Sequence, residues 1–256
     1  MRFDVPEREG ETLQLKISEN LERMWYVAQD LPTALQRSQK KVEIPWILSE
    51  IRHRIGLHAN ILDLGCGVGL SSNPISAAGY RVTALDLSAT ALVIAESRDS
   101  SGRVQYQVGD AYRTPFSNEQ YDVVLALDIL NNVSDPQSVI EEAYRLLKPG
   151  GLIIYNSFNK NIISWSLICQ GSKIFFRNRL PDFFMFPLFL QPEKIKHWLE
   201  ESGFEPLSIC GLRPQWLQKA NLKLMHSGFV SSEFKFTLSK SLSLFYVGCA
   251  KKMREQ

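Results

Sequence analysis

The sequence of 256 residues is long enough for one large α/β domain with a single core. Its formal net charge is +2, with acidic and basic residues interspersed, so the composition argues against a nucleic-acid partner. No secretory signal and no apolar run long enough to cross a bilayer occurs, and the four cysteines lack C-x-x-C spacing, which predicts reduced thiols in a cytoplasmic protein. The short basic clusters are expected to be solvated surface: Lys40-Lys41, Arg52-His53-Arg54 and Lys251-Lys252.

Residues 1–57 are expected to form an N-terminal helical cap, because apolar side chains recur at helical spacing from Leu21 to Ile51. The aromatic residues Trp25, Tyr26 and Trp46 in this segment have two interpretations. They line a ligand site, or they pack against a sheet, and for each residue alone packing is the preferred interpretation.

The stretch Ile61-Leu62-Asp63-Leu64-Gly65-Cys66-Gly67-Val68-Gly69 organises the rest of the chain. Its apolar run predicts a buried parallel strand ending near Asp63, and its glycines predict a tight turn into a helix over residues 70–78. Glycine lets a ligand approach the backbone closely, since it has no Cβ. Cys66 within the turn is interpreted as a packing residue and not as a nucleophile. We therefore expect a nucleotide-like ligand at the carboxyl ends of the strands.

Three further strands, over residues 81–86, 104–110 and 121–128, each end in a carboxylate. Asp86 is suited to accept hydrogen bonds from two ribose hydroxyls, and Asp110 is suited to accept one from an adenine amino group. The last of these strands is nearly all apolar, as expected for a strand buried on both faces. Alternation of strands and helices predicts a parallel sheet with helices on both faces.

In this order, the glycine turn and the acids resemble the class I S-adenosylmethionine-dependent methyltransferases over residues 58–157. An NAD-binding Rossmann domain is the competitor, but the third glycine of Gly65-x-Gly67-x-Gly69 comes one residue too early for its fingerprint. The resemblance implies a Rossmann-like α/β fold with a doubly wound, mostly parallel sheet of seven strands, and S-adenosylmethionine as the cofactor. The cofactor-binding residues that it implies are Asp63, Gly65, Cys66, Gly67, Asp86, Leu87, Asp110, Ala111 and Leu127.

Helix signals separate the predicted strands of this core. Ser88 is a suitable N-cap for a helix that runs to about Ser97. Asp135-Pro136 predicts the start of another helix, because proline tolerates the first helical position. Lys148-Pro149-Gly150-Gly151 ends that helix, and residues 152–157 are predicted to be the fifth strand.

Residues 158–191 are expected to be an insertion rich in aromatic residues. Lys173, Arg177 and Arg179 accompany a set of phenylalanines: Phe175, Phe176, Phe183, Phe184, Phe186 and Phe189. Aromatic residues beside cations suit a lid over an apolar acceptor, or a peripheral membrane contact through residues 173–190. The alternative is a helical insertion that packs its phenylalanines inward.

Residues 192–256 are expected to complete the sheet. A helix over 192–202 precedes a sixth strand over 204–210, and a seventh strand over 241–250 is predicted to form an antiparallel edge hairpin with it. Residues 212–236 carry no pattern that assigns them to an element.

The second half of the chain is similar to the ubiquinone-biosynthesis O-methyltransferases, in the segments Asp135–Val139, Asn156–Asn161, Gln191–Ile195 and Ile209–Leu212. This likeness implies a small, apolar aromatic acceptor, methylated on a phenolic oxygen close to a membrane. A small amine acceptor, or a cofactor-binding protein without catalysis, remains the alternative. The sequence does not predict the oligomeric state.

One departure from that family concerns the acceptor side. The family pattern after the fourth strand, Glu-x-x-Glu-His, suits a divalent cation, whereas this chain has Asp128-Ile129-Leu130-Asn131-Asn132. Neutral amides supply less charge and no general base, so no metal ligands are assigned, and Asp128 and Asn132 are the predicted acceptor-side residues. His197 and His226 are candidate bases, although a structural role is the preferred interpretation. The family also uses an arginine ahead of the first strand, for which Arg37, Arg52 and Arg54 are candidates.

Overall fold

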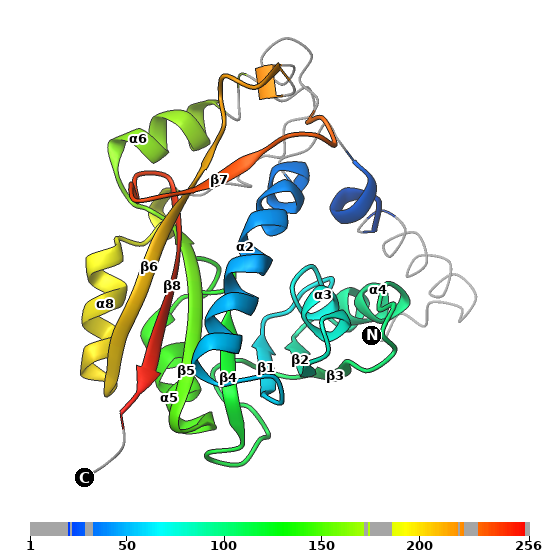
Figure 1. Ribbon diagram of the computed structural model, residues 1–256, viewed down its shortest axis with the longest axis vertical. Helices are drawn as coiled ribbons and strands as arrows, with labels where there is room; N and C mark the ends of the chain where they lie inside the picture. The colour runs from blue at the N-terminus through cyan, green and yellow to red at the C-terminus, as the bar shows by residue number, and fades with distance from the viewer. Residues whose placement is uncertain are drawn as a thin grey trace, which may run out of the picture.

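An eight-stranded sheet with the order β3-β2-β1-β4-β5-β8-β6-β7 forms the centre of the computed structural model (Figure 1). The structure describes residues 20, 22–28, 33–171, 174, 186–219, 221–222 and 230–253. The strands are β1 Asn60–Leu64, β2 Arg81–Asp86, β3 Gln105–Val108, β4 Tyr121–Ala126, β5 Leu147–Phe158, β6 Phe204–Pro214, β7 Phe236–Ser239 and β8 Phe245–Lys252. The helical segments are η1 Arg23–Val27, α2 Thr33–Arg54, α3 Ser72–Ala77, α4 Ala89–Ser97, α5 Pro136–Leu146, α6 Ile162–Ser164, η2 Trp165–Gln170, η3 Phe186–Leu188 and α8 Pro192–Glu201.

Strands β1 to β5 pair in parallel, and all five were predicted near their observed positions. Their order reverses at β1, which lies between β2 and β4. Because the strands are parallel, their carboxyl ends meet at one edge of the sheet, and the crevice beside the reversal is where open α/β sheets bind ligands.

The other half of the sheet is antiparallel, and it has one strand more than the seven predicted. Strand β6 continues to Pro214, four residues past the predicted end at Cys210, and its last residues from Gly211 pair with β7. Strand β8 pairs with β6 only as far as Leu212. Strands β3 and β7 both have four residues, but β3 is followed by the Gly109-Asp110 pair whereas β7 has no such motif beside it, and for this reason β7 could not be predicted.

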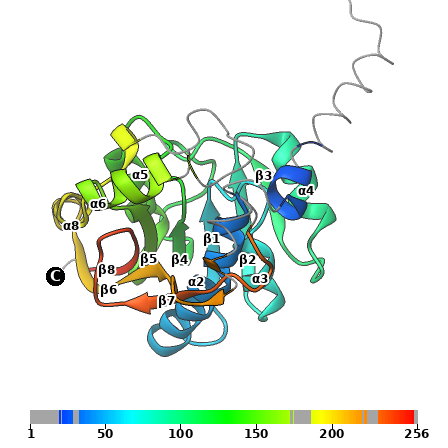
Figure 2. The same ribbon diagram turned by 90° about the horizontal axis from the view of Figure 1, so that it is seen from above.

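Helices cover both faces of the sheet, as the doubly wound prediction requires (Figure 2). Ile47 and Ile51 of α2 pack with one face of the sheet, whereas Val139 and Ile140 of α5 pack with the other face. Successive side chains of β4 point to opposite faces of the sheet. Val123 accordingly packs in the same apolar core as the α2 residues, and its neighbour Val124 packs in the core of the α5 residues. The predicted caps are confirmed, because Ser88 accepts from the Ala91 amide and Asp135 accepts from the Ser138 amide.

The aromatic insertion is described only in part. Phe189 is 2% exposed and stacks on Phe158 with ring centroids 4.9 Å apart, so this residue packs inward, as the alternative interpretation expects. The Phe186 ring packs against Phe189 with centroids 5.7 Å apart. The remaining phenylalanines of the set and its three cations lie outside the described residues. Within the described ranges, no helix is long and apolar enough to cross a membrane.

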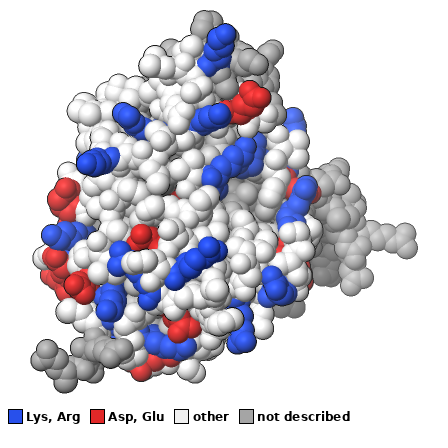
Figure 3. Space-filling view, viewed as in Figure 1, with Lys and Arg blue, Asp and Glu red and all other residues white. Residues whose placement is uncertain are grey.

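The basic clusters expected to be solvated are buried at two positions. Lys40 is 7% exposed and Lys252 is 5% exposed. Lys252 is buried because its ammonium group donates to the carbonyls of Tyr144 and Leu147 at 3.0 and 2.9 Å. On the face drawn in Figure 3, basic and acidic side chains are scattered among neutral ones and do not gather into one continuous basic area.

Candidate cofactor and acceptor site

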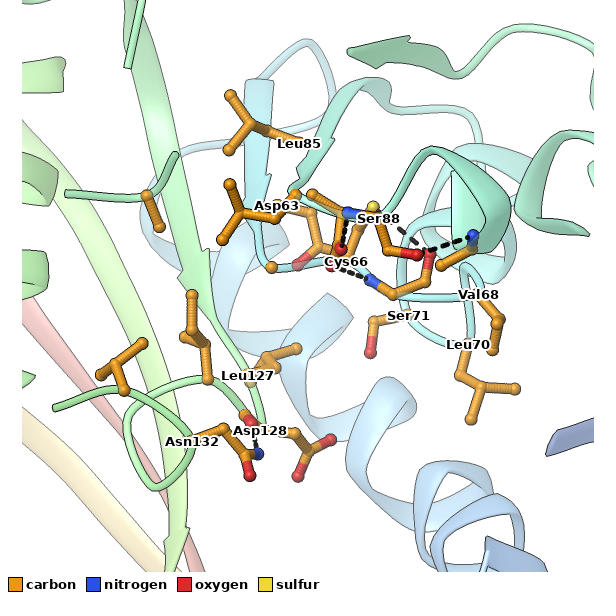
Figure 4. Close-up of a pocket in the computed structure, with 18 of the residues that line it drawn as sticks. Asp63, Cys66, Val68, Leu70, Ser71, Leu85, Ser88, Leu127, Asp128 and Asn132 are labelled. Atoms are coloured by element: carbon orange, nitrogen blue, oxygen red, sulfur yellow. Dashed lines mark hydrogen bonds between the residues drawn. The ribbon is translucent and has the colours of Figure 1, made fainter. Parts of the chain in front are cut away.

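A cavity of about 450 Å³ opens at the carboxyl ends of β1, β2 and β4 (Figure 4). This volume lies in the range that small-molecule sites occupy. Every residue predicted for the cofactor or the acceptor lines it: Asp63, Gly65, Cys66, Gly67, Asp86, Leu87, Asp110, Ala111, Leu127, Asp128 and Asn132. The sequence reasoning missed Lys40, which also lines the cavity.

The glycine turn forms one wall of this cavity. The amides of Gly65 and Cys66 donate to the Leu85 carbonyl at 2.8 and 3.1 Å, which fixes the turn against the end of β2. Gly65 has a φ of +70°, and a Cβ on it would lie 2.7 Å from Ile129. Gly67 has a φ of +53°, and nothing lies within 4 Å of the place where its Cβ would be. The turn therefore needs glycine for its backbone conformation, and at Gly67 it leaves open space for a ligand.

Asp86 is held in place by two backbone amides. Its Oδ2 accepts from the Gly67 amide and its Oδ1 accepts from the Ser88 amide, both at 2.8 Å. These bonds connect the glycine turn, the end of β2 and the N-terminus of α4. Each carboxylate oxygen still has a lone pair, so Asp86 can accept from two further donors on a ligand.

The wall formed by the glycine turn and Asp86, here called the cofactor wall, continues to Asp110 and the apolar side chains of Leu87, Ala111 and Leu127. Asp110 accepts from the Tyr112 amide at 2.9 Å, which orients its carboxylate. Ala111 and Leu127 are buried beneath the wall, whereas Leu87 is 71% exposed at its rim. An apolar side chain beside an oriented acid suits a planar base that carries an amino group.

Asp63 lies at the base of the cavity with 1% of its surface exposed, and it accepts a hydrogen bond from the Ser72 hydroxyl at 2.5 Å. Burial raises the pKa of Asp63 to about 7, although the Ser72 hydrogen bond and the Lys40 charge oppose this rise. Asp63 can therefore change its charge near neutral pH.

The raised pKa of Asp63 predicts a pH-dependent stability. In the unfolded chain this acid ionises at its ordinary low pKa, whereas in the folded protein it holds its proton up to about pH 7, so rising pH favours the unfolded state between these limits. Without ligand, the wild type is expected to lose roughly 2 kcal/mol of unfolding free energy relative to Asp63→Asn between about pH 5 and pH 7, and nothing further above about pH 8. Urea unfolding at each pH measures this difference, and parallel curves for the two proteins would contradict it.

Asp128 and Asn132 line the cavity from the loop that follows β4, away from Ser88 at the start of α4 (Figure 4). Asp128 has a φ of +58°, which is uncommon for a residue with a side chain. Its amide donates to the Asn156 Oδ1 at 2.6 Å, and its carbonyl accepts from the Asn132 side chain. These contacts fix the loop so that the Asp128 carboxylate faces the cavity with 27% of the side chain exposed.

Lys40 and Glu43 reach the same place from α2. The Lys40 ammonium lies 2.7 Å from the Asp128 Oδ2 and 2.9 Å from the Glu43 Oε2. Both residues precede β1 in the chain and look like part of a solvated helix, so nothing in the sequence pattern pointed to them. The signal that could have found them is an acid and a base spaced i, i+3 on a helix that must cover the sheet.

The other candidates are placed elsewhere. Arg37 donates to the Trp25 carbonyl at 2.7 Å and so holds η1, and the cavity is not lined by any of the three candidate arginines. Of the three aromatic residues, Trp25 lines the cavity, whereas Tyr26 and Trp46 pack against buried apolar residues and do not line it. His197 pairs with Glu201 on the exposed side of α8, and His226 lies outside the described residues.

The four cysteines are free thiols, and Cys66 is the one that lines the cavity. Burial raises the pKa of the Cys66 thiol, so the group stays protonated, in agreement with a packing role. Tyr26 packs beside the glycine turn and donates from its hydroxyl to the Val68 carbonyl at 2.5 Å.

Comparisons with known proteins agree with this site. A family model described as a methyltransferase domain matches residues 62–155. The ubiquinone biosynthesis O-methyltransferase of Pseudomonas savastanoi pv. phaseolicola is 32% identical over 173 residues, which cover 66% of this chain and 74% of that protein. The protein of the same name from Coxiella burnetii is 27% identical over 209 residues, covering 80% and 82% of the two chains.

Solved structures share the fold. A methyltransferase of Thermotoga maritima, described as S-adenosylmethionine-dependent and as a possible histamine N-methyltransferase, superposes with a TM-score of 0.58 at 18% identity, covering 84% of this chain and 90% of that chain. The fold, the glycine turn and the matched domain define an enzyme that uses S-adenosylmethionine to transfer methyl groups. The chain belongs to the class I methyltransferase family that contains the ubiquinone biosynthesis O-methyltransferases.

Proposed function

We propose that this methyltransferase acts on a hydroxyl of a small, apolar aromatic molecule, most simply a phenolic oxygen. The observation that carries the proposal is that one cavity is lined by Asp86 and Asp110 at the ends of β2 and β3 and by Asp128 on the loop after β4. The names of the relatives, ubiquinone biosynthesis O-methyltransferase, support oxygen as the methylated atom.

The cofactor is proposed to lie along the glycine turn. Asp86 would accept from the two ribose hydroxyls, Asp110 would accept from the adenine amino group, and Leu87 would contact the base. The methionine part would then extend over Gly65 and Gly67 toward Asp63, which places its methyl group in the part of the cavity that Asp128 borders.

Methyl transfer from a sulfonium needs an acceptor lone pair held in line with the S–CH3 bond. The oxygen of the acceptor forms the new bond to the methyl carbon, and the electrons of the S–CH3 bond return to sulfur, which leaves as a neutral thioether. A phenol must also lose its proton, and the carboxylate of Asp128 is the nearest group on the acceptor side that can accept it. Asn132 is proposed to act by holding the Asp128 loop.

The acceptor is proposed to come from a membrane surface. Segment α6–η2 follows the carboxyl end of β5 and therefore begins at the edge of the sheet where the cavity opens. Apolar side chains are exposed along it, at Ile162, Ile163, Trp165 and Leu167. The contact predicted for residues 173–190 lies mostly outside the described residues, and α6–η2 would extend it.

One assay tests the acceptor and the membrane contact together. Labelled S-adenosylmethionine is incubated with the protein and a catechol that carries a polyprenyl chain, presented in anionic lipid vesicles, and the protein that sediments with the vesicles is measured in the same tubes. Transfer to the catechol oxygen and co-sedimentation are the expected results. Transfer to small amines in a parallel panel, with none to phenols, would replace the proposal by an N-methyltransferase. Binding of S-adenosylhomocysteine without transfer to any acceptor would favour the protein without catalysis.

A further inference from the structure

Three charged side chains meet beneath the acceptor side of the cavity. Lys40 and Glu43 lie one turn apart on α2 and so project from the same face of the helix. The Lys40 side chain is 8% exposed and that of Glu43 is fully buried, whereas Asp128 keeps 27% of its side chain exposed to the cavity. The cluster is therefore closed on the side of the helix and open on the side of the ligand.

Asn156 of β5 joins the two carboxylates from below. Its side-chain amide donates to the Glu43 Oε1 at 2.6 Å, and its Oδ1 accepts from the Asp128 amide at 2.6 Å. Asn156 is fully buried, so these bonds do not compete with water. The Oδ2 of Asp128 is held by Lys40, and Oδ1 is left with a single contact at 3.3 Å, from Asn156.

The charge of Lys40 is fixed. Burial by itself would lower the pKa of Lys40, but the charges of Asp128 and Glu43 outweigh the burial and raise the pKa above its ordinary value. Lys40 therefore stays protonated and cannot act as a base. Burial raises the pKa of Glu43, and Lys40 opposes that rise by its charge. One cation thus faces two acids.

A divalent cation does not fit this arrangement. The ammonium group already occupies the position beside the Asp128 Oδ2, and the next polar side chains of the loop are the neutral amides of Asn131 and Asn132. Among the described residues, no three His, Cys, Asp or Glu side chains are grouped so that they could hold a metal ion. The Glu-x-x-Glu-His pattern of the similar O-methyltransferases has no counterpart here.

We propose that Lys40 supplies the fixed positive charge of the acceptor site in place of a divalent cation, and that Glu43 and Asn156 hold it there. Lys40 and Glu43 are positioning residues: they act through Asp128, whose free oxygen receives the proton of the acceptor hydroxyl while the O–CH3 bond forms and the S–CH3 bond breaks. The proton then passes to water in the cavity. This inference rests on the proposed function, since it assigns Asp128 to the acceptor.

Two further titratable groups face the cluster. Asp63 at the end of β1 interacts electrostatically with Lys40 and Asp128, and Cys210 of β6 interacts with Glu43. Burial raises the pKa of the Cys210 thiol to about 11, so this group stays neutral at the pH of the assay. Lys40 lowers the pKa of Asp63, so Lys40→Gln and the double variant raise that pKa alike, and the comparison between these two variants isolates the contribution of Glu43.

Lys40→Gln and the double variant Lys40→Gln/Glu43→Gln separate charge from packing. The single variant leaves two adjacent carboxylates without a cation, and one of them must take up a proton. We expect kcat at neutral pH to fall by about 10²-fold, with the acid limb of the pH profile moved to higher pH, while KM for S-adenosylmethionine stays unchanged. In the double variant the three cluster positions 40, 43 and 128 again carry a summed charge of −1, as in the wild type, and the pH profile is expected to recover. Lys41→Gln, at an exposed neighbour, is the control and should behave as the wild type.

The pH dependence of thermal unfolding provides a second measurement that needs no acceptor. In Lys40→Gln the carboxylates hold protons more strongly in the folded than in the unfolded state, so stability is present at low pH and is lost as pH rises. The double variant should lose less stability over the same rise in pH. A steep loss of stability with rising pH in Lys40→Gln would support the proposed charge balance of the cluster. If the wild type at the same time transferred no methyl group, the proposed function would be contradicted. Equal pH profiles and equal unfolding slopes for the single variant and the wild type, or wild-type transfer that a chelator stops, would overturn the inference.

Discussion

Replacing Asp86 by alanine is expected to reduce the affinity for S-adenosylhomocysteine by about 10²-fold or more, because two charge-assisted hydrogen bonds to the ribose are lost together. The same change removes the acceptor of the Gly67 and Ser88 amides. The turn then loses its connection to the N-terminus of α4, so the loss of affinity has a local structural part as well. Isothermal titration of the purified protein with S-adenosylhomocysteine measures the effect.

Asp110→Ala is the matched comparison for Asp86→Ala. It removes one proposed hydrogen bond to the base, and its carboxylate organises one backbone amide where Asp86 organises two. A loss of about tenfold is expected for Asp110→Ala, which is clearly smaller. Circular dichroism and melting temperatures identify a variant that fails to fold. Unchanged binding in a folded Asp86→Ala protein would show that the cofactor does not lie where we propose.

The cofactor wall could be predicted because each of its parts is local in the sequence. Asp63, Asp86 and Asp110 each lie within two residues of the end of a strand whose pattern is readable over a few residues, and parallel pairing then brings the strand ends to one edge of the sheet. The glycine turn is equally local. Neither step required knowledge of contacts between distant segments, and all the predicted residues line one cavity.

The acceptor side could be predicted only in part, because it depends on contacts between distant segments. Lys40 and Glu43 look solvated until α2 is placed over the ends of β4 and β5, where Asp128 and Asn156 supply their partners. Asn132 lines the cavity as expected, and the structure adds that its side-chain amide donates to the Asp128 carbonyl. A charge on a helix face gives no sign of burial in the sequence when its partner is far along the chain.

Replacing Asp128 by asparagine is expected to lower kcat by about 10²-fold to 10⁴-fold, the range that a positioned acid–base group contributes. Asparagine has the same shape and tolerates the left-handed backbone at this position, so the loop should keep its φ of +58° and its bond to Asn156. The amide oxygen can still accept from Lys40, but an amide cannot take the proton of a phenol. Because Asp128 is on the loop after β4 and is not among the residues proposed to bind the cofactor, the affinity for S-adenosylhomocysteine should stay close to that of the wild type. Single-turnover transfer with saturating cofactor measures the chemical step. A variant that transfers as fast as the wild type would remove Asp128 from the reaction, and with it the reason for the buried cation behind it.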